Sequence, residues 1–223
     1  EGATDPVAPA KRLRHGLGTV NRETTQTSTP RKPEPSMDPR TQEAIELLQA
    51  LIRTPSVSRD EARTADLVES LLAGKGVVSE RLHNNVWARA EGYDPARPTL
   101  LLNSHHDTVR PAASYTRDPF APTIEEGRLY GLGSNDAGAS VVALTETFLT
   151  FRRRELPFNL ILAISAEEEC MGEHGMRALI PALGKVDMAL VGEPPGMQAA
   201  VLAPIHACRL RRTPRDGARC APS

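Results

Sequence analysis

Three short apolar runs in the chain each end beside acidic or imidazole side chains. They are "LLNSHHD" from Leu101, "FNLILAIS" from Phe158 and "MALVGE" from Met188. A continuous apolar run with polar flanks is typical of a strand covered on both faces, as in a parallel α/β sheet. The carboxyl ends of such strands share one edge, where ligands bind. We therefore expect a three-layer α/β/α sandwich with a mostly parallel sheet, and a buried strand in each run.

Apolar residues at helical spacing lie between these runs. They predict a helix around residues 44–52, begun by Asp38 and Pro39 near its first turn. The pattern from Ser58 to Glu61 matches a capping box that would open a second helix, ending near Gly74 or Gly76. A glycine-rich turn precedes a third predicted helix, residues 139–151. Shorter extended pieces are expected at 85–90 and 99–103.

The chain divides into three regions by composition. Residues 1–36 are rich in proline and lack an apolar period, so we expect a disordered leader. Residues 37–204 carry the regular α/β pattern. Residues 205–223 gather arginine, proline and cysteine without a period and resemble translation in a wrong frame, so we expect a disordered tail.

Overall composition excludes several classes of partner. The 223 residues hold 27 Lys and Arg against 28 Asp and Glu, a net charge of -1, which gives no argument for nucleic acid or for an anionic membrane. No apolar run approaches the roughly 18 residues that would span a bilayer. The three cysteines form no CxxC pair, which favours a reducing compartment such as the cytoplasm.

Acids and one imidazole follow four separate segments of the predicted sheet. His105 and Asp107 follow one strand, Asp136 lies in the glycine-rich turn, residues 167–169 are all glutamate, and Glu193 follows the last apolar run. So many carboxylates at one rim would repel one another unless a cation neutralised them. Mixed imidazole and carboxylate ligands fit zinc, and also cobalt or manganese, whereas an all-oxygen magnesium site needs no imidazole.

Each motif by itself also has a simpler explanation. The HxD pattern of residues 105–107 is common in loops, and residues 167–169 alone would suit the solvated start of a helix. The segment "GLGSNDAG" lacks the Lys and Ser/Thr of a phosphate-binding loop, and Glu193 could simply end a strand. The ordered combination of the four motifs is what favours a metal site.

Four stretches resemble the M20 metallopeptidases, the family of zinc-dependent aminoacylases, acetylornithine deacetylases and succinyl-diaminopimelate desuccinylases. The matching text is "NSHHDTVRP", "GRLYGLGSNDAGAS", "ISAEEECMGEHG" and "LVGEPPGMQAA", in the family's order and spacing, within roughly residues 38–201. The segments "HHDTV" and "TRDPFAPTIEEGRLYGLGSNDAGAS" are especially similar to the acetylornithine deacetylase branch. This resemblance implies a cytoplasmic deacylase of arginine biosynthesis that binds one or two zinc ions, with Co²⁺ or Mn²⁺ as alternatives.

The resemblance also implies a role for each polar strand-end residue. His106 would be a spacer and Glu167 a supporting residue. The metal ligands would be His105 and Glu193 for a first ion, Glu169 for a second and Asp136 for both, with Asp107 orienting His105 and Glu168 acting as general base.

The chain departs from the family after Glu193. Relatives continue into an inserted lid and dimerisation domain, and then supply a final histidine for the second metal. His206 lies in an unrelated context and does not replace it. We therefore expect residues 37–204 to form a partial metallohydrolase domain, without the part through which the family is often homodimeric.

The expected reaction is hydrolysis of the amide of a small N-acyl amino acid, with N-acetylornithine favoured. Three alternatives stay open: a dipeptidase or carboxypeptidase of the same family, a non-catalytic truncated remnant, and a structural or partner-binding module.

Overall fold

The computed structural model describes residues 37–194, 209–210 and 220–221. The disorder predicted for residues 1–36 therefore lies outside the described residues, as do His206 and most of residues 205–223. Within that tail, the two-residue strands β8 (Arg209–Leu210) and β9 (Cys220–Ala221) pair antiparallel.

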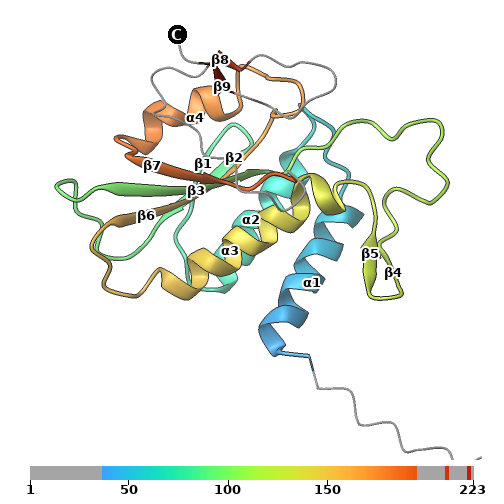
Figure 1. Ribbon diagram of the computed structural model, residues 1–223, viewed down its shortest axis with the longest axis horizontal. Coiled ribbons are helices and arrows are strands. Elements are labelled where there is room, and N and C mark those ends of the chain that lie inside the picture. Colours follow the sequence, from blue (N-terminus) through green and yellow to red (C-terminus); the bar gives the residue numbers. More distant parts are fainter. Residues whose placement is uncertain (1–36, 195–208, 211–219, 222–223) are drawn as a thin grey trace, which may run out of the picture. The chain divides into compact units, whose positions relative to one another are not determined.

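The centre of the described region is a five-stranded sheet in the order β1-β2-β6-β3-β7 (Figure 1). Strand β3 pairs in parallel with both β6 and β7, and β2 is antiparallel to β1 and to β6. Only β2 therefore runs against the common direction, which confirms the mostly parallel sheet. The strands are β1 (Glu80–Leu82), β2 (Asn85–Arg89), β3 (Thr99–His105), β6 (Asn159–Ser165) and β7 (Met188–Val191).

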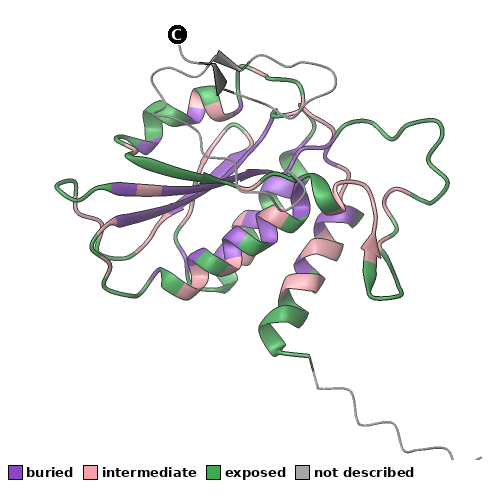
Figure 2. Cartoon of the chain, in the orientation of Figure 1, coloured by how far each residue is buried: buried purple, intermediate pink, exposed green. Residues whose placement is uncertain are grey.

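Helices cover both faces of this sheet, as the sandwich prediction requires. One apolar cluster joins β2, β3 and β6 to three helices, and a second joins the opposite strand faces to the fourth helix. Figure 2 shows the buried central strands between them. The first three helices are α1 (Pro39–Arg53), α2 (Ala62–Gly74) and α3 (Ala139–Phe151), and the fourth is α4 (Met176–Leu183).

Strand β6 shows why the sequence gives a three-layer fold. All seven of its residues are buried. Leu160, Leu162 and Ile164 belong to the cluster under α1–α3, while Ile161 and Ala163 belong to the cluster under α4. Alternate side chains of a strand point to opposite faces, so an unbroken apolar run has to be covered twice. Full burial of one such Leu or Ile side chain contributes about 1.5–3 kcal/mol.

Strand β7 corrects one expectation, because it was predicted to be buried. All four of its residues are exposed, with Met188 at 55%, Leu190 at 53% and Val191 at 44%. Within the part of the chain that the structure describes, β7 pairs with β3 alone and forms the edge of the sheet. Its apolar sequence correctly predicted a strand but not its position at the edge.

The second helix forms where it was predicted, but the capping box does not. Helix α2 begins at Ala62, and its N-cap residue Glu61 makes no side-chain capping bond. Ser58 and Glu61 instead bond to distant segments, which are described with the metal centre.

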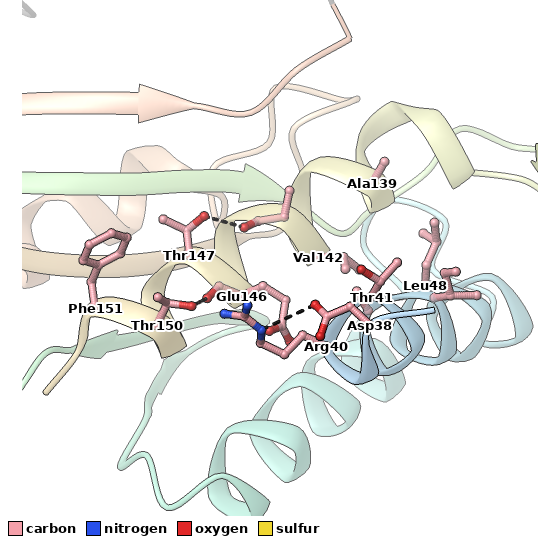
Figure 3. Close-up of a pocket in the computed structure, with 13 residues that line it drawn as sticks. Asp38, Arg40, Thr41, Leu48, Ala139, Val142, Glu146, Thr147, Thr150 and Phe151 are labelled. Atoms are coloured by element: carbon pink, nitrogen blue, oxygen red, sulfur yellow. Dashed lines mark hydrogen bonds and ion pairs between the residues drawn. The ribbon is translucent and has the colours of Figure 1, made fainter. Parts of the chain in front are cut away.

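A small hairpin and a groove complete the described fold. The hairpin consists of β4 (Thr123–Glu125) and β5 (Arg128–Tyr130). The groove lies between α1 and α3 and has a volume of about 460 Å³, with Leu48 and Val142 among its apolar lining residues and Glu146 among its polar ones (Figure 3). None of the helices in the described ranges has both the length and the apolar character needed to cross a bilayer.

Candidate metal centre

The polar strand ends meet at the carboxyl edge of the sheet, as the sequence predicted. His105 is the last residue of β3 and pairs in register with Ser165, the last residue of β6. The three glutamates therefore begin two residues beyond the level of His105, on the neighbouring strand. Glu193 lies two residues past the end of β7, which pairs with β3 on its other side.

Asp136 reaches this rim from a turn instead of a strand. It lies within the irregular helical turn η1 (Ser134–Gly138), which leads directly into α3. Its φ and ψ of -115° and 97° are extended, and the peptide bond to Ala137 is cis. Gly133 before the turn has φ of 72°, and a Cβ there would lie 2.7 Å from a Thr108 side-chain carbon. Glycine at this position therefore allows the turn to pack against the strand-end loop.

The His105 ring is the centre of the cluster. Its Nε2 atom lies 3.2 Å from Asp136 Oδ1, 3.7 Å from Glu193 Oε2 and 3.9 Å from Glu168 Oε2. The ring is almost completely buried, at 1% exposure, whereas the three carboxylates are partly open to solvent. One imidazole nitrogen thus faces carboxylates from three different segments.

Two sets of ligand atoms lie close enough together to share an ion. One set is His105, Asp136 and Glu193, and the other is His105, Glu168 and Glu169; within each set the atoms all lie within 4.8 Å of one another. One imidazole with two carboxylates is a donor set that zinc, cobalt and manganese accept. The residues present therefore fit a divalent cation, and their assignment as ligands stays a prediction.

Asp107 lies beneath this cluster, where it contacts the end of β3, the loop after β6 and the loop after α1. It is completely buried, and its Oδ1 lies 3.2 Å from His105 Nδ1. The backbone N–H of Glu168 donates to Oδ1 at 3.0 Å, and that of Glu169 donates to Oδ2 at 3.1 Å. The Ser58 hydroxyl also donates to Oδ2, at 2.6 Å. The carboxylate thus fixes the backbone of both glutamates, and it orients the imidazole together with the Asp107 backbone carbonyl, which lies 3.0 Å from Nδ1.

Charge crowding changes the proton affinity of the whole cluster. Burial alone would lower the pKa of His105, but hydrogen bonds and charge interactions with Asp107 and Glu193 raise it to about 11. Burial raises the pKa of Glu168 and of Glu169, and neighbouring carboxylates raise both further. For Asp107, burial opposes ionisation, yet bonds from His105, Ser58 and the two backbone N–H groups hold its pKa below the ordinary value. The cluster is therefore short of positive charge, which a bound cation would supply.

His106 points away from the cluster and is held by other groups. Its Nδ1 lies 2.7 Å from the Thr64 hydroxyl, and its Nε2 lies 2.9 Å from the Asn84 carbonyl oxygen. Burial lowers the pKa of His106 to about 4, so the neutral ring is favoured. A neutral ring uses both contacts if Nε2–H donates to Asn84 and Nδ1 accepts from Thr64. This geometry supports the prediction that His106 is a spacer.

Sequence reasoning missed two supporting residues, Ser58 and Glu61. Ser58 holds Asp107, and the completely buried Glu61 accepts the backbone N–H of Arg59 at 2.5 Å and that of Glu167 at 3.3 Å. Both were assigned to the capping box, because Ser-x-x-Glu before an apolar run is a normal helix start. No local signal distinguishes a glutamate that caps its own helix from one that bonds to a loop 106 residues away.

Known proteins with similar sequences support a family assignment. The model of peptidase family M20/M25/M40 matches residues 101–215. A succinyl-diaminopimelate desuccinylase of Delftia acidovorans is 29% identical over 171 residues, which are 69% of this chain and 44% of that protein. The enzyme of the same name from a Caulobacter species is 31% identical and covers 72% of this chain and 43% of its own. The chain thus spans less than half the length of these curated relatives.

Solved structures show the same fold. An M20 family metallo-carboxypeptidase from Sulfolobus solfataricus superimposes with a TM-score of 0.54 at 24% identity, covering 70% of this chain and 37% of its own. Human carnosine dipeptidase 1 gives a TM-score of 0.52 at 22% identity, covering 68% and 38%. Since the family model alone matches more than half of the 223 residues, the chain belongs to peptidase family M20/M25/M40.

Proposed function

We propose that the protein hydrolyses the amide bond of small N-acyl amino acids with the help of a bound divalent cation. The observation that carries this proposal is the convergence of His105, Asp136 and Glu193 at one rim, with Glu168 facing the same imidazole nitrogen. Metal-assisted hydrolysis requires side chains that hold the ion and a nearby carboxylate that can act as a base. The three converging residues would hold the ion, and Glu168 is the nearby carboxylate.

His105, Asp136 and Glu193 would hold the first ion, and Glu169 would contribute to a second. When bound, such an ion polarises the acyl oxygen of the substrate and lowers the pKa of an adjacent water from about 15.7 towards 7. Asp107 would keep the His105 ring in the tautomer and direction that ligation needs, because it contacts Nδ1 and leaves Nε2 free to face the cluster.

Glu168 is the proposed general base. Its backbone is fixed by Asp107, and its side chain is 45% exposed, so it can meet a substrate. Burial raises its pKa, which brings a carboxyl group closer to the neutral range in which it both accepts and returns a proton. In this role Glu168 takes a proton from the attacking water and delivers it to the amine nitrogen as the carbon–nitrogen bond breaks. General-base help of this kind is worth about 10²–10⁴-fold in rate.

Two substrates are candidates within this class. N-acetylornithine is favoured by the resemblance of residues 105–140 to acetylornithine deacetylases. N-succinyl-diaminopimelate is a second candidate because curated relatives at 29% and 31% identity are named for its hydrolysis. An N-acyl amino acid with a carboxylate or amine on its side chain is the class that both share.

The test is a hydrolysis assay on the full chain loaded with zinc, using a panel of N-acetyl, N-succinyl and dipeptide substrates. We expect N-acyl amino acids to be cleaved, and Glu168→Gln to lower kcat by about 10²–10⁴-fold while zinc still binds. The matched control is Glu155→Gln, an exposed glutamate on the far loop before β6, which should leave kcat unchanged.

Three other results would contradict the proposal in different ways. Cleavage of dipeptides alone would indicate the peptidase alternative. Tight zinc binding without hydrolysis of any member of the panel would indicate the truncated remnant. No effect of zinc or chelator on stability would indicate a structural module.

A further inference from the structure

A polar cleft lies at the same edge of the sheet, beside the metal centre. Its volume is about 800 Å³. It is lined from three loops and from the first turn of α4, and the loop after β6 also carries Glu168 and Glu169. The lining residues are Arg59, His83, Asn84, Ala166, Glu167, Met171, Gly172, Glu173, His174 and Arg177.

The position of the cleft follows from the strand order. The turn between β1 and β2 carries His83 and Asn84, and Asn85 Oδ1 accepts the Ala166 backbone N–H at 3.0 Å. This contact places the β1–β2 turn beside the carboxyl end of β6. The metal centre is above β3, on the other side of β6. Adjacent strands are about 4.8 Å apart, so the carboxyl end of β3 and the β1–β2 turn, two strands away, are separated by roughly 10 Å.

Arginine and histidine side chains make up four of the six exposed lining residues. The guanidinium groups of Arg59 and Arg177 have no ion-pair partner among the residues that the structure describes, whereas Arg81, Arg89 and Arg117 each contact an acid. The His83 and His174 rings lie together, with centroids 4.2 Å apart and planes tilted by 37°. An anion placed between these four side chains would find donors on several sides.

The cleft contains two acids, and only one of them is without a partner among the described residues. Glu167 is buried and already used, because its Oε2 accepts the His174 backbone N–H at 3.2 Å and its Oε1 lies 3.4 Å from His174 Nδ1. Glu173 is the remaining acid, and it is exposed. Glu167 is thus paired with His174, which leaves the two guanidinium groups and the His83 ring in the cleft with one solvated carboxylate.

The backbone around the cleft is held in a rare conformation. Arg59, His83, Glu167 and Met171 all have positive φ, at 78°, 55°, 54° and 50°. They are four of the five non-glycine residues with positive φ in the described part of the chain, and all four line this cleft. Left-handed non-glycine backbone is unfavourable and persists only where its surroundings enforce it, and such positions gather at binding sites.

Glu61 is the group that enforces this shape. Its buried carboxylate accepts the backbone N–H of Arg59 and of Glu167, and the Asn84 side-chain amide at 2.9 Å. These three donors come from the three loops that line the cleft. A Cβ on Gly172 would lie 1.7 Å from Glu167 Oε2, so the loop after β6 closes tightly over that carboxylate. The cleft is thus preorganised from beneath.

We propose that this cleft is a binding site for the carboxylate group of a small molecule, with Arg59, Arg177, His83 and His174 as its donors. The carboxylate belongs either to the part of the substrate remote from the scissile amide or to a separate small acid. The site does not require hydrolytic activity, because it is formed by residues outside the metal cluster.

The first experiment measures direct binding of glutarate to the full chain after metal has been removed and the chelator dialysed away. Calorimetry should show saturable binding, and Arg59→Gln and Arg177→Gln should each raise Kd at least tenfold. Arg128→Gln, an exposed arginine of β5 outside the cleft, is the matched control and should leave Kd unchanged. Glutaramide, the neutral analogue, should not compete with glutarate.

Absence of saturable glutarate binding would overturn the proposal, as would equal Kd values in the two cleft variants and the unsubstituted chain. Circular dichroism confirms that the variants are folded, and both replaced side chains are exposed.

A second arm distinguishes the two sources of the carboxylate. In the zinc-loaded chain, glutarate and a non-cleaved N-acyl amino acid analogue are titrated together. Mutually exclusive binding assigns the carboxylate to the substrate, and simultaneous binding assigns the cleft to a separate acid. If the zinc-loaded chain binds glutarate but hydrolyses no member of the substrate panel, the proposed function is rejected and the assignment of the cleft stands.

Discussion

The Ser58 hydroxyl donates a hydrogen bond to the buried carboxylate of Asp107, with 2.6 Å between Oγ and Oδ2. The two residues are 49 positions apart in the chain. The same Oδ2 accepts the Glu169 backbone N–H, and Oδ1 contacts both His105 and the Glu168 backbone. The loop after α1 therefore helps to fix the strand-end loops from which the proposed metal ligands project.

Asp107→Asn should weaken zinc binding by about 10–100-fold, the usual effect of losing a group that orients a ligand. An amide keeps one acceptor oxygen and replaces the other with an NH₂ group, so the backbone N–H of Glu168 or that of Glu169 loses its acceptor. Competition with a chromophoric chelator measures the affinity. Ser58→Ala removes one of the four contacts of the Asp107 carboxylate and should weaken zinc binding less. Equal zinc affinity in Asp107→Asn and the unsubstituted chain would contradict the orienting role of Asp107.

Zinc should stabilise the folded chain, because the carboxylates around His105 bind it only when the sheet edge is assembled. At a free concentration 100 times Kd, a ligand specific for the folded state adds about 2.7 kcal/mol. Thermal unfolding with and without zinc measures this gain. Glu193→Gln should remove most of it and Glu155→Gln none, so a zinc-dependent shift that is equal in both variants would argue for binding elsewhere.

His106 should make the metal-free chain sensitive to acid. Burial lowers its pKa from 6.5 to about 4 in the folded state, so the unfolded chain binds the proton more readily. Its contribution is therefore complete above pH 6.5 and is lost as the pH falls from 6.5 to about 4, a change of about 3 kcal/mol. His105, whose folded pKa is raised, is protonated in both states below pH 6.5, so its contribution to stability stays nearly constant across this window.

Urea unfolding at several pH values measures that loss. His106→Gln keeps a donor for Asn84 and an acceptor for Thr64 but cannot titrate, so its stability should fall less between pH 6.5 and 4. A slope unchanged by His106→Gln would assign the acid sensitivity to other groups.

Glu61→Gln should destabilise the fold by about 1–3 kcal/mol. The amide nitrogen of glutamine cannot accept from the N–H groups that now surround the carboxylate, so at least one buried donor loses its partner. Urea unfolding gives the free energy difference. The neighbouring Asp60→Asn changes an exposed acid and should stay within about 0.5 kcal/mol of the unsubstituted chain.

The sequence by itself determined the elements that local chemistry dictates. The helix predicted at residues 139–151 is α3, with the same bounds. The run "FNLILAIS" became β6, buried on both faces, because a strand that is apolar at every position has no face suited to solvent. The meeting of His105 and Glu193 also followed from the sequence, since the ends of parallel strands share one edge, whereas Asp136 reaches that edge from the turn before α3.

Tertiary structure decided what depends on partners distant in the sequence. Strand β7 is as apolar as β6 but lies at the sheet edge, because burial depends on the neighbouring elements and not on the strand itself. Ser58 and Glu61 match a capping box, yet they bond to Asp107 and to the loop of Glu167. A side chain that satisfies a local pattern can gain more from a buried distant partner, and only the assembled fold brings that partner within reach.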